Sequence, residues 1–176
     1  MTDQVAYDVI KKIDKLEIRQ YPEVIFAVVE NDRYDSGFNL LFQYISGKNK
    51  TKSKISMTAP VLTSEKIKMT APVITRNNYM AFAIPFSYNK ETVPKPTNPS
   101  VKIEVQPKKL MAVLRFGGRT PETRVQEYIQ ELISILNTHK IEIKGEPVLM
   151  RYNSPFTPGF LRRNEVAVEI IKNNKK

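Results

Sequence analysis

Few side chains in this sequence could carry out covalent chemistry. The 176 residues include one histidine, His139, and no cysteine, which excludes disulfides, thiolate catalysis and cysteine-based zinc or iron–sulfur sites. A Ser-His-Asp triad could use only His139, which follows a predicted helix and suits the negative end of its dipole. No cluster of His, Asp and Glu has the spacing of metal ligands, and Gly117-Gly118 indicates a turn. The sequence therefore offers no catalytic or metal-binding set and favours a binding protein over an enzyme.

Residues 55–75 contain a short internal repeat. Ile55–Thr63 reads ISMTAPVLT and Ile67–Thr75 reads IKMTAPVIT, an offset of 12 residues with seven of nine positions identical. β-branched residues favour extended backbone, and proline cannot donate to a sheet ladder. We therefore expect two extended segments, each with a proline at an edge or bulge. Met57 and Met69 hold equivalent positions and either fill the core or line a pocket for a flat apolar ligand.

The charge of the chain is strongly basic. There are 28 Lys and Arg against 18 Asp and Glu, a formal net charge of +10, which favours an anionic partner or simply aids solubility. The densest run, Lys48–Lys54, has no aromatic residue for base stacking, and no helix carries a basic stripe, so nucleic acid is disfavoured. This run is either a solvated loop or a place where Lys48 and Lys54 hold carboxylates or phosphates of a ligand.

The length indicates a single domain over residues 1–176. A chain of this size buries enough surface to fold without disulfides or metals. The N-terminus lacks an apolar signal sequence, and no apolar run reaches about 18 residues, so we expect a cytoplasmic protein without a membrane span. We also expect a monomer.

Patterns of apolar residues predict an α+β fold. Alternating or continuous apolar runs predict strands over residues 5–10, 15–21, 24–29, 79–84, 101–106, 110–116, 141–143, 148–152 and 166–171. One helix is predicted after the strand at 24–29 and another after the strand at 110–116. This order of strands and helices predicts two β-β-α-β-β units joined into one antiparallel sheet or barrel.

Each predicted helix has recognisable ends. In the first, Asp35 or Ser36 can cap the start and Gly47 supplies a left-handed stop; Tyr44 lies beside its apolar stripe. In the second, Thr120 is the predicted cap and Pro121 the first helical residue. Its apolar stripe comprises Val125, Tyr128, Ile129, Leu132, Ile133 and Leu136, and the helix should end near 137–138.

Several of these stretches together resemble the SOUL family of haem-binding proteins. The doubled Met-Thr-Ala-Pro-Val resembles the form seen in prokaryotic members. Leu41–Asn49 is similar to the end of the family's helix, and Pro94–Pro96 leads into a strand as in the family. Tyr152–Pro155 and Arg162–Val166 match its last signature, so the resemblance covers nearly the whole chain. Glu17, Arg19 and Tyr21 resemble a further family phrase, for which we expect a structural role.

The resemblance implies a distorted antiparallel β-barrel flanked by two helices. It also implies that haem or a related tetrapyrrole lies in an apolar groove near the first helix and the loop before the last strand. On this chain the groove would be lined by Tyr44, the ring contacts Met57, Met69, Phe156 and Phe160, and the propionate contacts Lys48, Lys54 or Arg162. Because no histidine falls in this groove, haem iron would be held by a Met or Tyr or by no protein ligand.

Two alternatives remain open. The family also resembles the effector-binding domains of some transcription regulators, which implies a small-molecule sensor or hydrolase. That protein would use a pocket carboxylate such as Glu104, which otherwise faces solvent from its alternating strand. The last alternative is an interaction domain without a cofactor.

Overall fold

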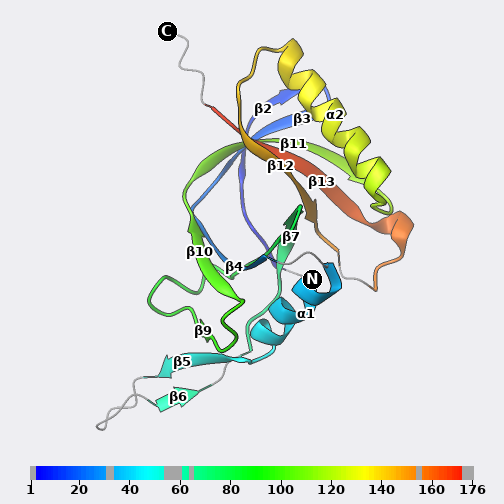
Figure 1. Ribbon diagram of the computed structural model, residues 1–176. Coiled ribbons are helices and arrows are strands. Elements are labelled where there is room, and N and C mark those ends of the chain that lie inside the picture. Colours follow the sequence, from blue (N-terminus) through cyan, green and yellow to red (C-terminus); the bar gives the residue numbers. More distant parts are fainter. Residues whose placement is uncertain (1–2, 31–33, 54–60, 64–65, 154–155, 172–176) are drawn as a thin grey trace. The chain divides into compact units, whose positions relative to one another are not determined.

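The computed structural model describes residues 3–30, 34–53, 61–63, 66–153 and 156–171. The chain divides into two compact units. The first unit comprises residues 1–5, 24–73 and 77–106, and the second comprises 6–23, 74–76 and 107–176. Within the described residues, each unit combines one α-helix with strands that pair mostly antiparallel (Figure 1). The predicted α+β class is therefore confirmed.

The main sheet of the first unit has β4 (Val24–Glu30) at its centre. Antiparallel β10 (Lys102–Gln106) and β8 (Tyr79–Ala83) flank it, so that Phe26 stands opposite Glu104 on one side and Ala83 on the other. Strand β7 (Thr70–Arg76) begins in the first unit, where short β1 (Asp3–Gln4) pairs with it in parallel.

Helix α1 (Tyr34–Ile45) covers one face of this sheet. Its buried residues Leu41, Tyr44 and Ile45 join a core cluster with side chains of β4 and β8. The ring of Phe38 meets the ring of Phe82 edge to face, with ring centroids 5.3 Å apart. Aromatic pairs favour this arrangement. Gly47 ends the helix with a φ of 115°, in the left-handed region where the missing side chain avoids strain.

A smaller sheet of the first unit holds Val61–Thr63, the end of the first copy of the repeat. Its order is β6 (Val61–Thr63), β5 (Asn49–Ser53) and β9 (Lys95–Pro96), all antiparallel. Residues 70–75 of the second copy lie in β7, so the extended conformation predicted for the repeat is confirmed at Val61–Thr63 and in β7, which belong to different sheets. Lys54 and Met57 lie outside the described residues.

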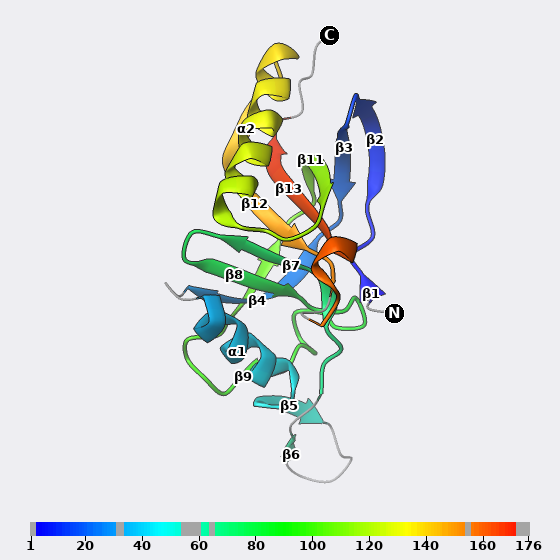
Figure 2. The same ribbon diagram turned by 90° about the vertical axis from the view of Figure 1, so that its right-hand side faces the viewer.

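The second unit is built on a five-stranded antiparallel sheet of order β12-β13-β11-β3-β2 (Figure 2). Its strands are β2 (Asp8–Ile13), β3 (Leu16–Tyr21), β11 (Lys109–Gly117), β12 (Ile143–Arg151) and β13 (Arg163–Ile170). The two short strands predicted at 141–143 and 148–152 form the single strand β12, whose pairing with β13 is interrupted between Lys144 and Val148. Gly145 lies in this interruption with a φ of 85°.

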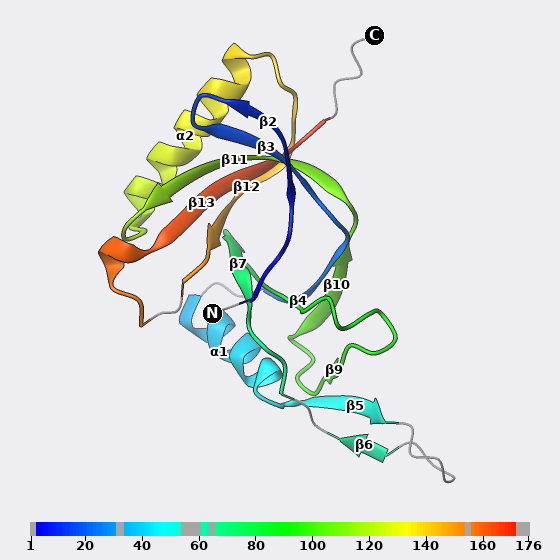
Figure 3. The same cartoon turned by 180° about the vertical axis from the view of Figure 1, so that it is seen from behind.

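Helix α2 (Glu122–Thr138) packs on β11, β12 and β13 (Figure 3). Leu132 and Leu136 are fully buried in a cluster with side chains of one face of the sheet, Leu114 and Val166 among them. The ring of Tyr128 stacks on that of Phe116 at 4.2 Å. This helix and sheet face form the core of the second unit.

The start of α2 differs from the prediction. Pro121, and not Thr120, holds the capping position, with φ −62° and ψ 152° and no side-chain cap hydrogen bond. The hydroxyl of Thr120 instead accepts a hydrogen bond from Arg151 Nε at 3.4 Å. The hydroxyl that the local pattern assigned to the helix cap is thus engaged in a hydrogen bond with a residue distant in sequence. The predicted end is confirmed, because His139 follows the helix and its N–H reaches the carbonyl of Ile135.

The closed barrel, the β-β-α-β-β repeat and the single domain over residues 1–176 stay predictions. Neither helix found among the described residues has the length and apolar character that crossing a membrane requires.

Candidate functional site

A concavity of about 330 Å³ lies in the first unit, between α1 and the proline-rich segment that precedes β10. Its wall is formed by Leu40, Gln43, Tyr44, Lys48, Pro96, Thr97, Asn98, Pro99 and Val101. Two of the predicted site residues, Tyr44 and Lys48, are thus brought together. The wall residues 96–99 were missed, because the density of prolines in residues 85–100 indicated only a stiff surface connection. Leu40 and Gln43 lie on the helix near which the groove was expected, but they were not singled out.

The wall is held by hydrogen bonds between α1 and the proline-rich segment. The buried hydroxyl of Tyr44 donates to the carbonyl of Pro94 at 2.7 Å, and the amide of Asn49 donates to the carbonyl of Tyr44 at 2.9 Å. The hydroxyl of Thr97 donates to the carbonyl of Lys48 at 2.9 Å. Tyr44 therefore positions the wall, and its hydroxyl is directed to Pro94.

The concavity has a mixed wall, with apolar and polar side chains and one cation. Leu40, Pro96, Pro99 and Val101 supply apolar surface. The exposed ammonium of Lys48 lies 3.0 Å from the amide oxygen of Gln43, to which it donates. Such a site suits an apolar molecule that carries a carboxylate.

The other described site residues have different surroundings. Met69 is half-buried and packs against the core cluster of the first unit. In the second unit, Phe156 and Phe160 are exposed, and Arg162 Nε donates to the carbonyl of Thr157 at 2.8 Å. Their common role as ligand contacts remains a prediction.

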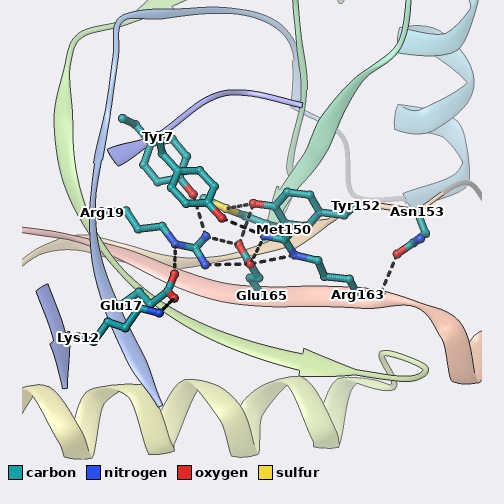
Figure 4. Close-up of polar contacts among 10 residues, drawn as sticks. Tyr7, Lys12, Glu17, Arg19, Met150, Tyr152, Asn153, Arg163 and Glu165 are labelled. Carbon is teal, nitrogen blue, oxygen red and sulfur yellow. Dashed lines mark hydrogen bonds and ion pairs between the residues drawn. The ribbon is translucent and has the colours of Figure 1, made fainter. Parts of the chain in front are cut away.

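A buried network of charged and aromatic residues occupies the second unit. Glu165, which has no exposed surface, lies on the face of β13 opposite to the residues that pack on α2. Arg19 of β3 donates to both carboxylate oxygens at 2.7 and 3.1 Å, and Arg163 donates to one of them at 2.7 Å. The hydroxyl of Tyr152 donates to the other at 2.7 Å (Figure 4).

Aromatic rings and a second carboxylate complete this network. The guanidinium groups of Arg19 and Arg163 lie 4.1 Å from the ring centroids of Tyr7 and Tyr152, respectively, at a distance favourable for cation–π attraction. Glu17 accepts a hydrogen bond from Arg19 Nε at 2.8 Å. Every charge in the network therefore faces an opposite charge or an aromatic ring.

The network shifts the pKa values of its members. Burial alone would raise the pKa of Glu165, but hydrogen bonds and charge from Arg19, with hydrogen bonds from Arg163 and Tyr152, hold it below its ordinary value. Burial raises the pKa of Tyr152, and the neighbouring Tyr21 and Glu165 raise it further. The carboxylate thus stays ionised and fully paired, which suits a structural role better than proton transfer.

Sequence patterns identified only part of this network. Glu17, Arg19 and Tyr21 were expected to be structural, and Arg19 and Tyr21 are indeed buried. Glu165 was not singled out, although a carboxylate immediately before the apolar stretch of β13 is a signal for a buried pair.

The two other groups considered for chemistry have different surroundings. Glu104 is half-buried, and the hydroxyl of Tyr79 lies 3.4 Å from its carboxylate. His139 is exposed at the end of α2. In the part of the chain that the structure describes, no three His, Asp or Glu side chains are placed to hold a metal ion.

Comparison with known proteins identifies relatives along nearly the whole chain. The family described as "SOUL heme-binding protein" matches residues 2–169. A Homo sapiens protein named "Heme-binding protein 2" is 33% identical over 164 residues, covering 89% of this chain and 78% of that protein. Its Mus musculus counterpart is 32% identical over 165 residues, with the same coverage of 89% and 78%.

Solved structures share the fold at low identity. The EcmrR C-terminal domain has a TM-score of 0.54 at 10% identity and covers 94% of this chain and 98% of its own. A hydrolase from Listeria innocua has a TM-score of 0.54 at 12% identity, covering 92% of this chain and 94% of its own. At these identities the likeness concerns the fold alone.

Proposed function

Because the chain belongs to the SOUL heme-binding protein family, we propose that it binds haem or a related tetrapyrrole without catalysing a reaction. The observation that carries the proposal is the concavity beside α1, whose mixed wall joins apolar surface from Leu40, Pro96 and Pro99 to the ammonium of Lys48. Its volume of about 330 Å³ is at the small end for ligand sites. It therefore receives one edge of the macrocycle and leaves the rest of the ring to other contacts.

In this proposal Lys48 meets a propionate, while Leu40 and the two prolines Pro96 and Pro99 contact the ring edge. Met57, Met69, Phe156 and Phe160 are proposed as further ring contacts, and Lys54 and Arg162 as further partners of the carboxylates. Because the Met-Thr-Ala-Pro-Val motif occurs twice in residues 55–75, we also propose that the chain is of the prokaryotic type of the family.

The described wall fits the ring and its carboxylates better than it fits the iron. Proteins hold haem iron through His, Cys, Met or Tyr, and Tyr44 is the one such residue among those that line the concavity. Its hydroxyl donates to the carbonyl of Pro94. We therefore propose that affinity comes from the ring and the propionates, with no iron ligand from this wall.

Titration with ferric haem, followed by visible absorbance, tests the proposal. Wild type should show a saturable Soret shift. Lys48→Glu should weaken binding by about tenfold or more, because it replaces attraction to a propionate by repulsion. Lys50→Glu is the matched control, since it makes the same charge change on β5 outside the wall, and it should stay within about twofold of wild type.

Two results would contradict the proposal. An absent Soret shift argues against tetrapyrrole binding, and equal effects of the Lys48 and Lys50 variants place the ligand elsewhere. Phe160→Ala reports separately on the second set of contacts. Binding of small cationic or ester-bearing molecules that is lost in Glu104→Ala would instead support the sensor or hydrolase alternative.

A further inference from the structure

A short turn in the second unit exposes an unusual amount of apolar surface. The 3₁₀-helix η1 (Gly159–Leu161) lies between β12 and β13. Phe156 is 95% exposed, Phe160 81% and Leu161 62%. Three large apolar side chains within six residues are thus exposed, and apolar side chains that gather on a surface mark interaction sites in soluble proteins.

Arginine side chains surround this turn. The backbone N–H of Gly118 donates to the carbonyl of Arg162 at 3.0 Å, so η1 lies beside the start of α2 (Figures 1 and 3). The side chain of Arg119 packs so closely on Gly159 that an added Cβ would lie 2.7 Å from its Cγ. Arg124 packs on Gly118 in the same way. We call Arg119, Arg124, Phe156, Phe160, Leu161 and Arg162 the Phe–Leu–Arg patch.

The backbone of the turn is already hydrogen-bonded. The N–H of Leu161 donates to the carbonyl of Pro158 at 3.0 Å, and that of Arg162 donates to Gly159 at 3.2 Å. These two N–H groups therefore keep their partners if the turn enters an apolar medium. The long stems of the arginines can lie along the same surface while their charged ends stay in water.

We propose that the Phe–Leu–Arg patch is a docking surface for membranes that contain anionic lipids. Phe156, Phe160 and Leu161 would enter the interfacial region, and the three arginines would meet lipid headgroups. The first turn of α2 contributes one acid, Glu122, so the charge of the patch is positive. The rings of Phe156 and Phe160 could stack on nucleic-acid bases, but Leu161 and Pro158 add aliphatic surface that gains from contact with hydrocarbon and not from contact with a base. The membrane is therefore favoured, and RNA binding is kept as an outcome of the test.

A single-tryptophan reporter tests the insertion directly. The chain contains no tryptophan, so Leu161→Trp adds one probe at the patch. Vesicles of phosphatidylcholine and phosphatidylserine should move its emission to shorter wavelength. Phe86→Trp is the matched control, because Phe86 is 55% exposed in the first unit, and its emission should not move.

Cosedimentation with the same vesicles measures the affinity. Leu161→Asp should lower partitioning by about tenfold, because it removes an inserted leucine and adds a charge that anionic lipids repel. Phe86→Asp makes the same charge change outside the patch and should lower it by no more than about twofold. Arg119→Gln should weaken binding more than Lys108→Gln, which removes one charge near the opposite end of β11.

These measurements use protein without tetrapyrrole and depend on Leu161, which the ligand proposal does not use. The membrane proposal fails if wild type does not bind the vesicles, or if the Leu161 and Phe86 variants behave alike. It also fails if the patch variants lose binding to single-stranded RNA while vesicle binding is unchanged. The haem titration can succeed or fail independently of each of these outcomes.

Discussion

Glu165 shows how one residue can organise a region of the molecule. Its carboxylate accepts hydrogen bonds from Arg19, Arg163 and Tyr152 and has no exposed surface. A buried charge of this kind is tolerated only while its partners remain in place. Loss of the negative charge would leave the guanidinium of Arg19, itself 3% exposed at the side chain, buried beside a neutral group.

Glu165→Gln should therefore lower the free energy of unfolding by about 3–5 kcal/mol at neutral pH. The control is Glu169→Gln, because Glu169 lies on the same strand as Glu165 and forms a partly exposed ion pair with Lys144 of β12. This substitution should lower the free energy of unfolding by at most about 1 kcal/mol. Urea denaturation of the three proteins checks both values. Equal effects of the two substitutions would mean that the network does not stabilise the fold.

Wild type and Glu165→Gln should differ in how their stability responds to acid. The pKa of folded Glu165 is lowered from an ordinary value of 4.5, so the unfolded chain binds the proton more readily. The stabilisation is therefore present above about pH 4.5 and is lost as the pH falls through the folded-state pKa. The stability difference between wild type and Glu165→Gln should shrink over this acidic range, as urea denaturation at stepped pH would measure.

At the scale of elements, α2 shows which part of an apolar stripe meets a sheet. Leu132 and Leu136 are fully buried against the sheet, and Val125, Tyr128, Ile129 and Ile135 pack at the margin of the same cluster. Ile133 is half-buried, although the sequence pattern placed it in the stripe. A helix turn of 3.6 residues puts Leu132 and Leu136 on one line and turns Ile133 by about 100° away from it.

Leu132→Ala should accordingly destabilise the protein by about 2–5 kcal/mol, because it opens a cavity in a closed core. Ile133→Ala removes an apolar side chain of similar size from the neighbouring position and should cost less than half as much. Thermal denaturation followed by circular dichroism compares the two. A larger loss from the Ile133 variant would contradict the observed orientation of α2.

At the scale of the whole molecule, the chain path interleaves the two units. The chain passes from one unit to the other after residues 5, 23, 73, 76 and 106. Neither unit is therefore formed by one continuous stretch, and unfolding one of them would leave the other closed by long flexible loops at an entropic cost. This connectivity supports the prediction of a single cooperative domain.

We expect the two units to unfold in one transition. Because the chain lacks tryptophan, Phe38→Trp in α1 and Tyr128→Trp in α2 would report on the first and second core, respectively. Their fluorescence midpoints in urea should coincide with each other and with the loss of far-ultraviolet circular dichroism. Two separate midpoints would divide the chain into two domains.

Local patterns were sufficient for the identity of most elements. The apolar period of α2, the extended conformation of β3 and β10 and the stop at Gly47 follow from backbone geometry and neighbouring residues, and the structure confirms them. Burial along β10 does not alternate as the sequence pattern does, since Ile103–Gln106 are all half-buried. The family resemblance placed Tyr44 and Lys48 in one groove near the end of the first helix, and both line the concavity. The start of α2 was wrong because Thr120 is held by Arg151, whose position no local pattern reveals.

The pairing of distant strands required the folded chain. Arg19 and Glu165 are 146 residues apart, and they meet because β3 and β13 both pair with β11. The wall of the concavity likewise depends on Tyr44 reaching Pro94, 50 residues further along the chain. The apolar period of a segment indicates which face of a helix or strand is buried. Which strands pair with one another depends on hydrogen-bond register between segments distant in sequence. Apolar patterns therefore led to the α+β class, the resemblance of several motifs led to the family, and tertiary pairing decided which charges are buried.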